Sequence, residues 1–309
     1  MIQSPEDPPE RPEGDGTDLP REQVDTRAPD RQQVSGAPTT GEDPQIQHAL
    51  EVSRRHAELL REAGVDPVGV YVIGSTAVGD RWPHSDIDTV TVTREPVGDA
   101  ELLQRVHDQI TAEVSGTYYD TTYVRYDWLA EPPADHTVAP HTQEGRLRLD
   151  QAAPIHPVTW LELSTAITAD GEPVEHLPVA VDLGRVESYT RANLSSYWAK
   201  VADSLTAAAE GKPADAPLTN PYPVVWTVLG APRLAAMLDR LHQTAPGQVP
   251  RLVSKTEAGD WVRTHLPHYA ELAERALADR HGRPASFTVA DATAAARLVG
   301  EVIVVANSR

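Results

Sequence analysis

Hydrophobic positions in the first half of the chain alternate between helical and strand periods. Apolar residues recur at steps of three and four after Gln45 until Gly64 breaks the pattern. Further on, an apolar run ends abruptly at Gly74-Ser75, and a later run alternates Asp or Thr with Ile or Val. The predicted elements are a helix over 45–63, strands over 68–73 and 87–92, a helix over 102–110 and a strand over 117–124. This order predicts a small α/β domain with a mixed sheet covered by helices on one side.

The second half of the chain reads as helical. Residues 128–157 are rich in Pro and His and have poor periodicity, so a long loop or cover segment is expected there. The predicted helices beyond it cover 186–209, 223–241, 254–279 with an interruption at Pro267, and 288–306. Ser254 and Glu257 have the spacing of a capping box. The prediction is therefore an α+β protein, with a sheet domain at 45–157 and a C-terminal helical bundle at 158–309.

Residues 1–44 differ in composition from the rest of the chain. They hold eight prolines, no aromatic residue, and eleven acidic against four basic residues. Such a segment buries too little apolar area to offset the entropy lost on ordering. We therefore expect a disordered acidic tail.

Charge and composition exclude several classes of function. The formal net charge of −19 repels polyanions, so nucleic acid is an unfavourable partner. The absence of cysteine excludes thiol catalysis and Cys-ligated zinc. The N-terminus lacks a signal-peptide pattern and no stretch has the apolar length of a membrane span, which favours a cytoplasmic protein without membrane contact.

One segment concentrates residues that suit phosphate and metal chemistry. The strand ending at Gly74-Ser75 offers backbone amides and a hydroxyl where phosphate oxygens could bind, and Gly74 permits close approach. Asp86 and Asp88 are two positions apart on the next strand, so their carboxylates point the same way and can converge on a divalent cation. Asp120 lies inside the third strand, where a lone carboxylate needs a partner or a metal.

These residues resemble a known signature. An apolar strand, Gly74-Ser75, a spacer and Asp86-Ile87-Asp88 are similar to the DNA polymerase β-type nucleotidyltransferase superfamily. Pro83-His84-Ser85 before the first acid makes the segment similar to the aminoglycoside adenylyltransferases that act on streptomycin and spectinomycin. In that family a third acid completes the catalytic set, and Asp120 matches it. The resemblance implies that Asp86, Asp88 and Asp120 are catalytic and bind Mg²⁺.

The resemblance extends over roughly residues 50–280 and into the helical half. Segments 226–234 and 253–261 resemble the helical domain of those enzymes, in which Asn220 and Lys255 match residues that face the nucleotide. The implied activity is Mg²⁺-dependent transfer of AMP from ATP to a hydroxyl of a small molecule. An aminoglycoside or aminocyclitol antibiotic, a cationic acceptor, is the expected substrate, and antibiotic resistance the implied role.

Other interpretations remain open for several of these residues. Asp120 could instead pair with Arg125, and Arg233 could be a solvated residue of an amphipathic helix. His84 is expected to stabilise the turn before Asp86, and Trp198 and Trp226 are expected in the core. Two further functions are also possible: a nucleotidyltransferase with a protein or tRNA acceptor, and a nucleotide-binding module without turnover.

Overall fold

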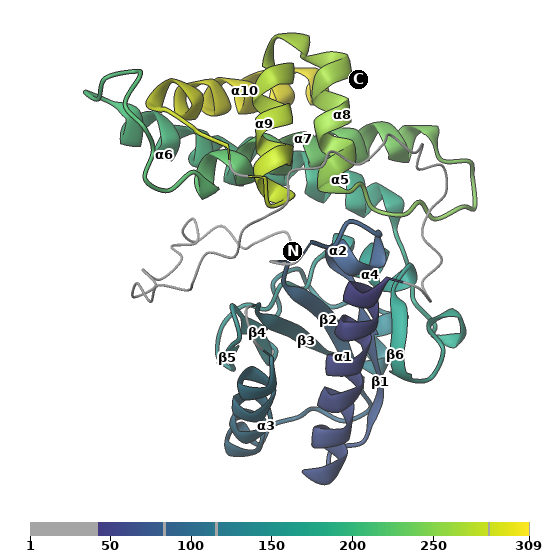
Figure 1. Ribbon diagram of the computed structural model, residues 1–309. Helices are drawn as coiled ribbons and strands as arrows, with labels where there is room; N and C mark the ends of the chain where they lie inside the picture. Colours follow the sequence, from purple (N-terminus) through teal and green to yellow (C-terminus); the bar gives the residue numbers. More distant parts are fainter. Residues whose placement is uncertain (1–42, 83–84, 115–116, 284, 309) are drawn as a thin grey trace.

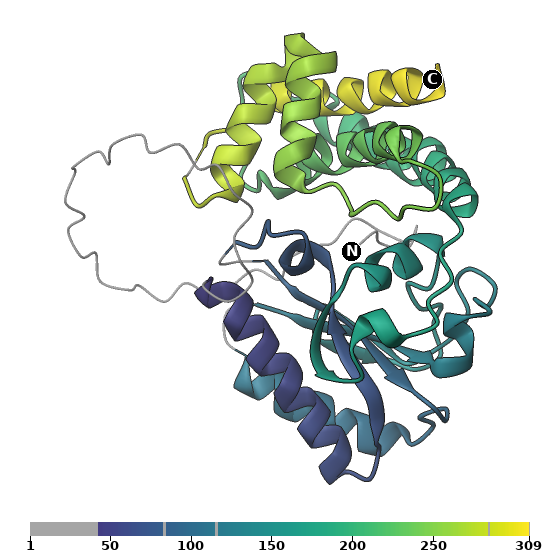
Figure 2. The ribbon, with the colours of Figure 1, turned by 90° about the vertical axis from the view of Figure 1, so that its right-hand side faces the viewer.

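The computed structural model describes residues 43–82, 85–114, 117–283 and 285–308, so most of the predicted tail lies outside the described residues. Figure 1 shows a sheet layer below a layer of helices, and Figure 2 shows the same arrangement from the side. The helices are α1 (Pro44–Glu62), α2 (Gly74–Ala77), α3 (Ala100–Glu113), α4 (Pro157–Ser164), α5 (Leu183–Asn193), α6 (Ala199–Ala209), α7 (Tyr222–Gln243), α8 (Lys255–His265), α9 (Ala270–Arg280) and α10 (Val289–Asn307). The strands are β1 (Pro67–Val72), β2 (Ile87–Thr93), β3 (Tyr119–Arg125), β4 (His141–Gln143), β5 (Arg146–Arg148) and β6 (Ile167–Gly171).

The strands form one mixed six-stranded sheet in the order β5-β4-β3-β2-β1-β6. Only β2 and β3 run parallel, and α3 makes the crossover between them. The remaining neighbours pair antiparallel. The predicted α+β class is confirmed: a mixed sheet is followed by a helical region.

Both faces of the sheet are covered, whereas the sequence predicted helices on one face. Residues of α1 and α3, such as Leu60 and Leu103, pack with Ile87 and Tyr119 on one face. Trp160 of α4 packs on the other face with side chains of the irregular segment between β3 and β6. The expected one-sided cover is therefore wrong, because this Pro-rich segment and α4 bury the second face.

Two boundaries also differ from the sequence prediction. The expected loop at 128–157 contains the short hairpin β4-β5, which extends the sheet beyond β3. Residues 167–171 form β6 and pair with β1, although the predicted boundary at 157 places them in the helical domain. The sheet layer therefore runs at least to Gly171.

The C-terminal helices pack around α7. This helix contacts α5, α8, α9 and α10 and supplies Val228, Leu229 and Leu238 to a large apolar core. The predicted break at Pro267 is present between α8 and α9. The helix predicted over 186–209 is instead divided into α5 and α6 by a π-helical turn at Leu194–Trp198. Among the described residues, no helix has both the length and the apolar character that crossing a bilayer requires.

A buried polar network lies between α1, α3 and the sheet. The hydroxyl of Tyr123 lies 3.0 Å from Nε2 of both His56 and His107, and Nδ1 of His56 lies 2.9 Å from the hydroxyl of Tyr119. Burial lowers the pKa of His107 to about 4 and holds the pKa of His56 well below its usual value. Both imidazoles are therefore neutral in the folded protein near pH 7.

This network predicts loss of stability in mild acid. A histidine with a lowered folded-state pKa contributes fully above its unfolded pKa of about 6.5, and that contribution is lost as the pH falls toward the folded value. The free energy of unfolding of the wild type should therefore exceed that of His107→Gln by about 1–2 kcal/mol less at pH 5 than at pH 7. Urea unfolding at both pH values measures this difference. The exposed His48 gives the control, since His48→Gln should leave the pH dependence unchanged. An advantage that does not change with pH would contradict the interpretation.

Candidate active site

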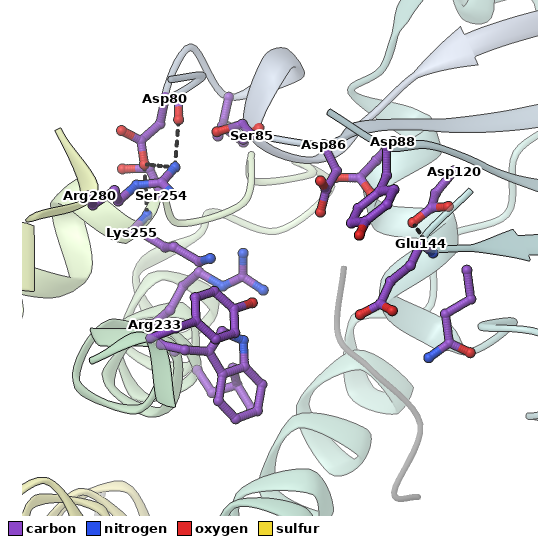
Figure 3. A pocket seen from close by; sticks show the side chains of 18 of the residues that line it. Asp80, Ser85, Asp86, Asp88, Asp120, Glu144, Arg233, Ser254, Lys255 and Arg280 are labelled. Carbon is purple, nitrogen blue, oxygen red and sulfur yellow. Dashed lines mark hydrogen bonds and ion pairs between the residues drawn. The ribbon is translucent and has the colours of Figure 1, made fainter. Parts of the chain in front are cut away.

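The predicted acids converge at one edge of the sheet. Asp86 comes directly before β2, Asp88 is the second residue of β2, and Asp120 is its partner across the parallel pair with β3. The intervening Ile87 is buried on the opposite face, against α1 and α3. Figure 3 shows the carboxylates of Asp86, Asp88 and Asp120 side by side on one wall of a cleft. The structure therefore brings the three predicted acids together.

Gly74 serves this arrangement in a different way from the one expected. It has a positive φ of 63°, and a Cβ placed on it would approach Oδ2 of Asp88 to 2.4 Å. The missing side chain therefore makes room for the carboxylate of Asp88. Ser75, the next residue, lines the cleft beside the acids.

A hairpin turn that the sequence did not reveal holds Asp120. The backbone amides of Glu144 and Gly145, between β4 and β5, donate to the two carboxylate oxygens at 3.0 and 2.9 Å. Both turn residues have positive φ, as a tight hairpin requires. Asp120 does not pair with Arg125, which binds Asp127 instead. Burial raises the pKa of Asp120 to about 8 despite the two amides, and the charges of Asp88 and Asp86 add to the shift.

The acids have the chemistry of a divalent-cation site. Oδ1 of Asp88 is buried and has no hydrogen-bond partner among the described residues. Burial and the charge of Asp88 raise the pKa of Asp86 to about 6. A cation here would satisfy the unpartnered oxygen and relieve the repulsion between these carboxylates.

The described residues contain no complete set of three or more histidine or acidic side chains placed to hold a metal ion. Mg²⁺ usually retains several waters and binds through one or two carboxylates together with substrate phosphates. The acidic wall therefore fits a metal that arrives with a phosphate ligand.

The opposite wall of the cleft is basic and comes from the helical layer. Arg233 of α7, Lys255 of α8 and Arg280 of α9 line the same cleft as the three acids. Burial lowers the pKa of Lys255 to about 7, and the charges of Arg280 and Arg233 lower it further, against the opposing effect of Asp86 and Asp88. Arg233 is half-buried and lines the cleft, so the interpretation of Arg233 as a solvated surface residue of the helix does not hold.

The turn before Asp86 depends on residues that the sequence analysis did not single out. The buried Arg81 donates through Nη1 to the backbone oxygen of Asp86 at 2.7 Å. The amide of Trp82 donates to Oγ of Ser85 at 3.0 Å. His84, to which we assigned the turn, lies outside the described residues.

Four aromatic side chains also line the cleft. Tyr197 and Trp198 come from the π-helical turn, and Tyr222 and Trp226 come from α7. The rings of Trp198 and Trp226 are in contact, with centroids 4.4 Å apart and planes tilted by 30°. Trp198 belongs to the helical core as expected and Trp226 packs against it, and both also line the cleft, the alternative that the sequence left open.

Asn220 and Lys255, the predicted nucleotide contacts, occupy different positions. Oδ1 of Asn220 accepts the amide of Tyr222 at 3.0 Å and so caps the start of α7. Asn220 lines an adjoining pocket with Trp82 and Arg280, whereas Lys255 lines both this pocket and the main cleft. Of the two, only Lys255 is among the residues that line the cleft of the three acids.

Residues 53–130, which hold the three acids, match the nucleotidyltransferase domain family. Most of the chain is similar in structure to the spectinomycin adenyltransferase AAD(9) from Enterococcus faecialis, solved with ATP and spectinomycin. That similarity has a TM-score of 0.58 at 15% identity and covers 82% of this chain and 98% of the other. Likeness at this identity establishes a shared fold. No curated protein matches the sequence significantly.

The raised pKa of Asp120 predicts a pH dependence of stability in metal-free protein. The folded carboxyl, with its pKa of about 8, retains a proton that the unfolded chain releases above about pH 4. Stability contributed by that proton is present in acid and is lost as the pH rises toward 8, by up to about 1.4 kcal/mol per pH unit.

Asp120→Asn should remove much of the decline in stability between about pH 6.5 and pH 8. The buried histidines contribute equally to both proteins, so the difference between the two slopes isolates Asp120. Urea unfolding in the presence of a chelator measures it. The exposed Asp66 provides the control Asp66→Asn, which should keep the wild-type slope. Equal slopes in wild type and Asp120→Asn would contradict the assignment.

Proposed function

We propose that this protein is a Mg²⁺-dependent adenylyltransferase that moves AMP from ATP to a hydroxyl of a small molecule. The observation that supports this most strongly is the cleft itself. Asp86, Asp88 and Asp120 from the nucleotidyltransferase domain face Arg233 and Lys255 from the helices. A polyphosphate with bound Mg²⁺ presents the two complementary charges that such walls require.

Each wall has a separate task in this proposal. Asp86 and Asp88 would hold Mg²⁺, which when bound neutralises charge on the transferring and leaving phosphate oxygens. The hydroxyl of Ser75 would donate to a phosphate oxygen, and Lys255 and Arg233 would neutralise the pyrophosphate. Asp120 would orient the acceptor hydroxyl and take its proton, because bound Mg²⁺ would favour the ionised carboxylate over the protonated form that the metal-free site favours.

The acceptor would bind in the cleft between the acids of the sheet and the aromatic side chains of the helical layer. AAD(9), the similar structure, holds spectinomycin together with ATP. We propose an aminoglycoside or aminocyclitol as the acceptor here, because aromatic faces suit sugar rings and Glu144 adds a carboxylate near the acids. The cleft is not uniformly acidic, so the preference for a cationic acceptor rests on this wall alone.

Pyrophosphate release tests the proposal directly. The full-length protein would be incubated with Mg²⁺, ATP and one acceptor at a time, including spectinomycin, other aminoglycosides, neutral cyclitols, proteins and tRNA. Release that depends on a cationic aminocyclitol or aminoglycoside supports the proposal. Pyrophosphate release only with a protein or tRNA would show that the acceptor is a macromolecule and not a small molecule. Nucleotide binding without any pyrophosphate release would show that the protein is a nucleotide-binding module.

Removing one metal-directed carboxylate should abolish turnover without unfolding the protein. Asp86→Asn or Asp88→Asn is expected to lower kcat/KM at least about a thousandfold, because the charge that would hold Mg²⁺ is lost. The melting temperature should change by less than about 4 °C, since each substitution also relieves repulsion among the acids. Activity within about threefold of the wild type in either variant would reject the mechanism. Asp66→Asn, on an exposed loop, is the matched control.

The KM values of the acceptor and of ATP should respond differently to salt. Between roughly 20 and 200 mM salt the Debye length shortens from about 20 to about 7 Å, which screens the attraction between the acidic wall and a polycation. The KM of a cationic acceptor should therefore rise several-fold, whereas the KM of ATP should change less, because its phosphates are held at contact distance by buried groups. Steady-state kinetics at constant Mg²⁺ measures both. An acceptor KM that is independent of salt would remove the electrostatic account of acceptor binding.

A further inference from the structure

Asp80 connects the two walls of the cleft. It follows α2 and is 8% exposed, and its carboxylate faces the first turn of α8. Oδ2 accepts hydrogen bonds from the backbone amides of Lys255 and Thr256 at 3.0 and 3.3 Å. Oδ1 accepts a hydrogen bond from the hydroxyl of Thr256 at 2.7 Å. One side chain of the sheet layer therefore satisfies three donors of one helix end.

The same residue also binds α9. Nη2 of Arg280 donates to the backbone oxygen of Asp80 at 2.8 Å and lies 3.5 Å from its Oδ2. Nearby, the ring of Trp82 stacks on His281 with centroids 3.8 Å apart, and its Nε1 donates to Oδ1 of Asp80 at 3.2 Å. These contacts join the turn before Asp86 to the ends of two helices that lie far along the chain.

The contacts of Asp80 leave a defined role for the side chain of Lys255. Ser254 and Glu257 already form the capping box of α8, with Glu257 N donating to Ser254 Oγ at 3.0 Å and Ser254 N donating to Glu257 Oε2 at 2.8 Å. The carboxylate of Asp80 accepts the amides of Lys255 and Thr256, so the backbone donors at the start of α8 are already satisfied by an anionic side chain of the protein. The ammonium of Lys255 remains to face the cleft.

Electrostatics explains why an anion is needed at this point. Arg233, Lys255 and Arg280 crowd one buried wall, where like charges repel and the loss of water is costly. Asp80 places a buried carboxylate within ion-pair distance of Arg280 and beside the backbone of Lys255. Asp80 thereby offsets part of the repulsion among the three cations and holds Lys255 and Arg280 in position.

We infer that Asp80 is a positioning residue that pins the start of α8 and Arg280 to the nucleotidyltransferase domain and so sets Lys255 for the phosphates of the nucleotide. This inference rests on the proposed function, because it assigns Lys255 to ATP. Asp80 itself acts through Lys255 and Arg280 and need not touch substrate.

The test uses Asp80→Asn and the milder Thr256→Val in the full-length protein. Asn keeps one acceptor oxygen but loses the charge opposite Arg280, and Val removes only the hydroxyl donated to Oδ1. Hydrogen exchange over residues 252–262 should become faster in Asp80→Asn, a change that does not depend on ATP. The Kd of a non-hydrolysable ATP analogue with Mg²⁺ should weaken about tenfold in Asp80→Asn and a few-fold in Thr256→Val, with KM for ATP following and kcat changing less. The exposed Asp203 of α6 provides the control Asp203→Asn, which should match the wild type.

A second comparison separates positioning from a general loss of stability. In a Lys255→Met background, Asp80→Asn should weaken nucleotide binding little further, because the group it positions is already absent. Additive effects, or a nucleotide Kd in Asp80→Asn equal to that of the wild type, would overturn the inference while leaving the proposed function intact. If the wild type binds no Mg²⁺-nucleotide, the proposed function fails and this inference fails with it.

Discussion

Opposed buried charges across the interface of the two layers are the constraint on which this structure depends. Asp86, Asp88 and Asp120 stand on the sheet, and Arg233, Lys255 and Arg280 stand on three different helices. Desolvated charges are costly unless a partner of opposite sign is close. The opposite charges nearest in effect to Arg233 and Arg280 are Glu162 and Asp80, whereas Lys255 is influenced by Asp86 and Asp88 across the cleft. Asp80 is also the residue through which the layers are hydrogen-bonded at that place.

The acidic and basic side chains face the same cleft without pairing directly, so groups on both walls are available to a ligand. Oδ1 of Asp88 lacks a partner among the described residues, and desolvation together with the charges of Arg280 and Arg233 lowers the pKa of Lys255 to about 7. Both groups are poised to gain from a ligand that brings a cation to one wall and phosphate oxygens to the other. A Mg²⁺-nucleotide meets both needs at once, which is why we favour group transfer from ATP.

The parts of the site that sequence predicted are those encoded locally. Asp86 and Asp88 share a side of one strand because side chains alternate, and Asp120 joins them because a helical crossover makes β2 and β3 parallel neighbours. Asp80 and Arg280 could not be paired in advance, since they are 200 positions apart. The amides that hold Asp120 were hidden in a Pro- and His-rich stretch without strand periodicity. Trp198 has the spacing of a core residue, and only the π-helical turn, which has no simple sequence signal, places it in the cleft wall.

The position of bond cleavage in ATP tests the account most directly. ATP labelled separately at the α- and γ-phosphorus would be turned over with the acceptor that supports pyrophosphate release, and the products separated. A cleft in which the acids hold Mg²⁺ at the transferring phosphate and the basic wall holds the leaving group predicts α-label on the acceptor and γ-label in pyrophosphate. Transfer of γ-label to the acceptor, or its release as inorganic phosphate, would contradict the account.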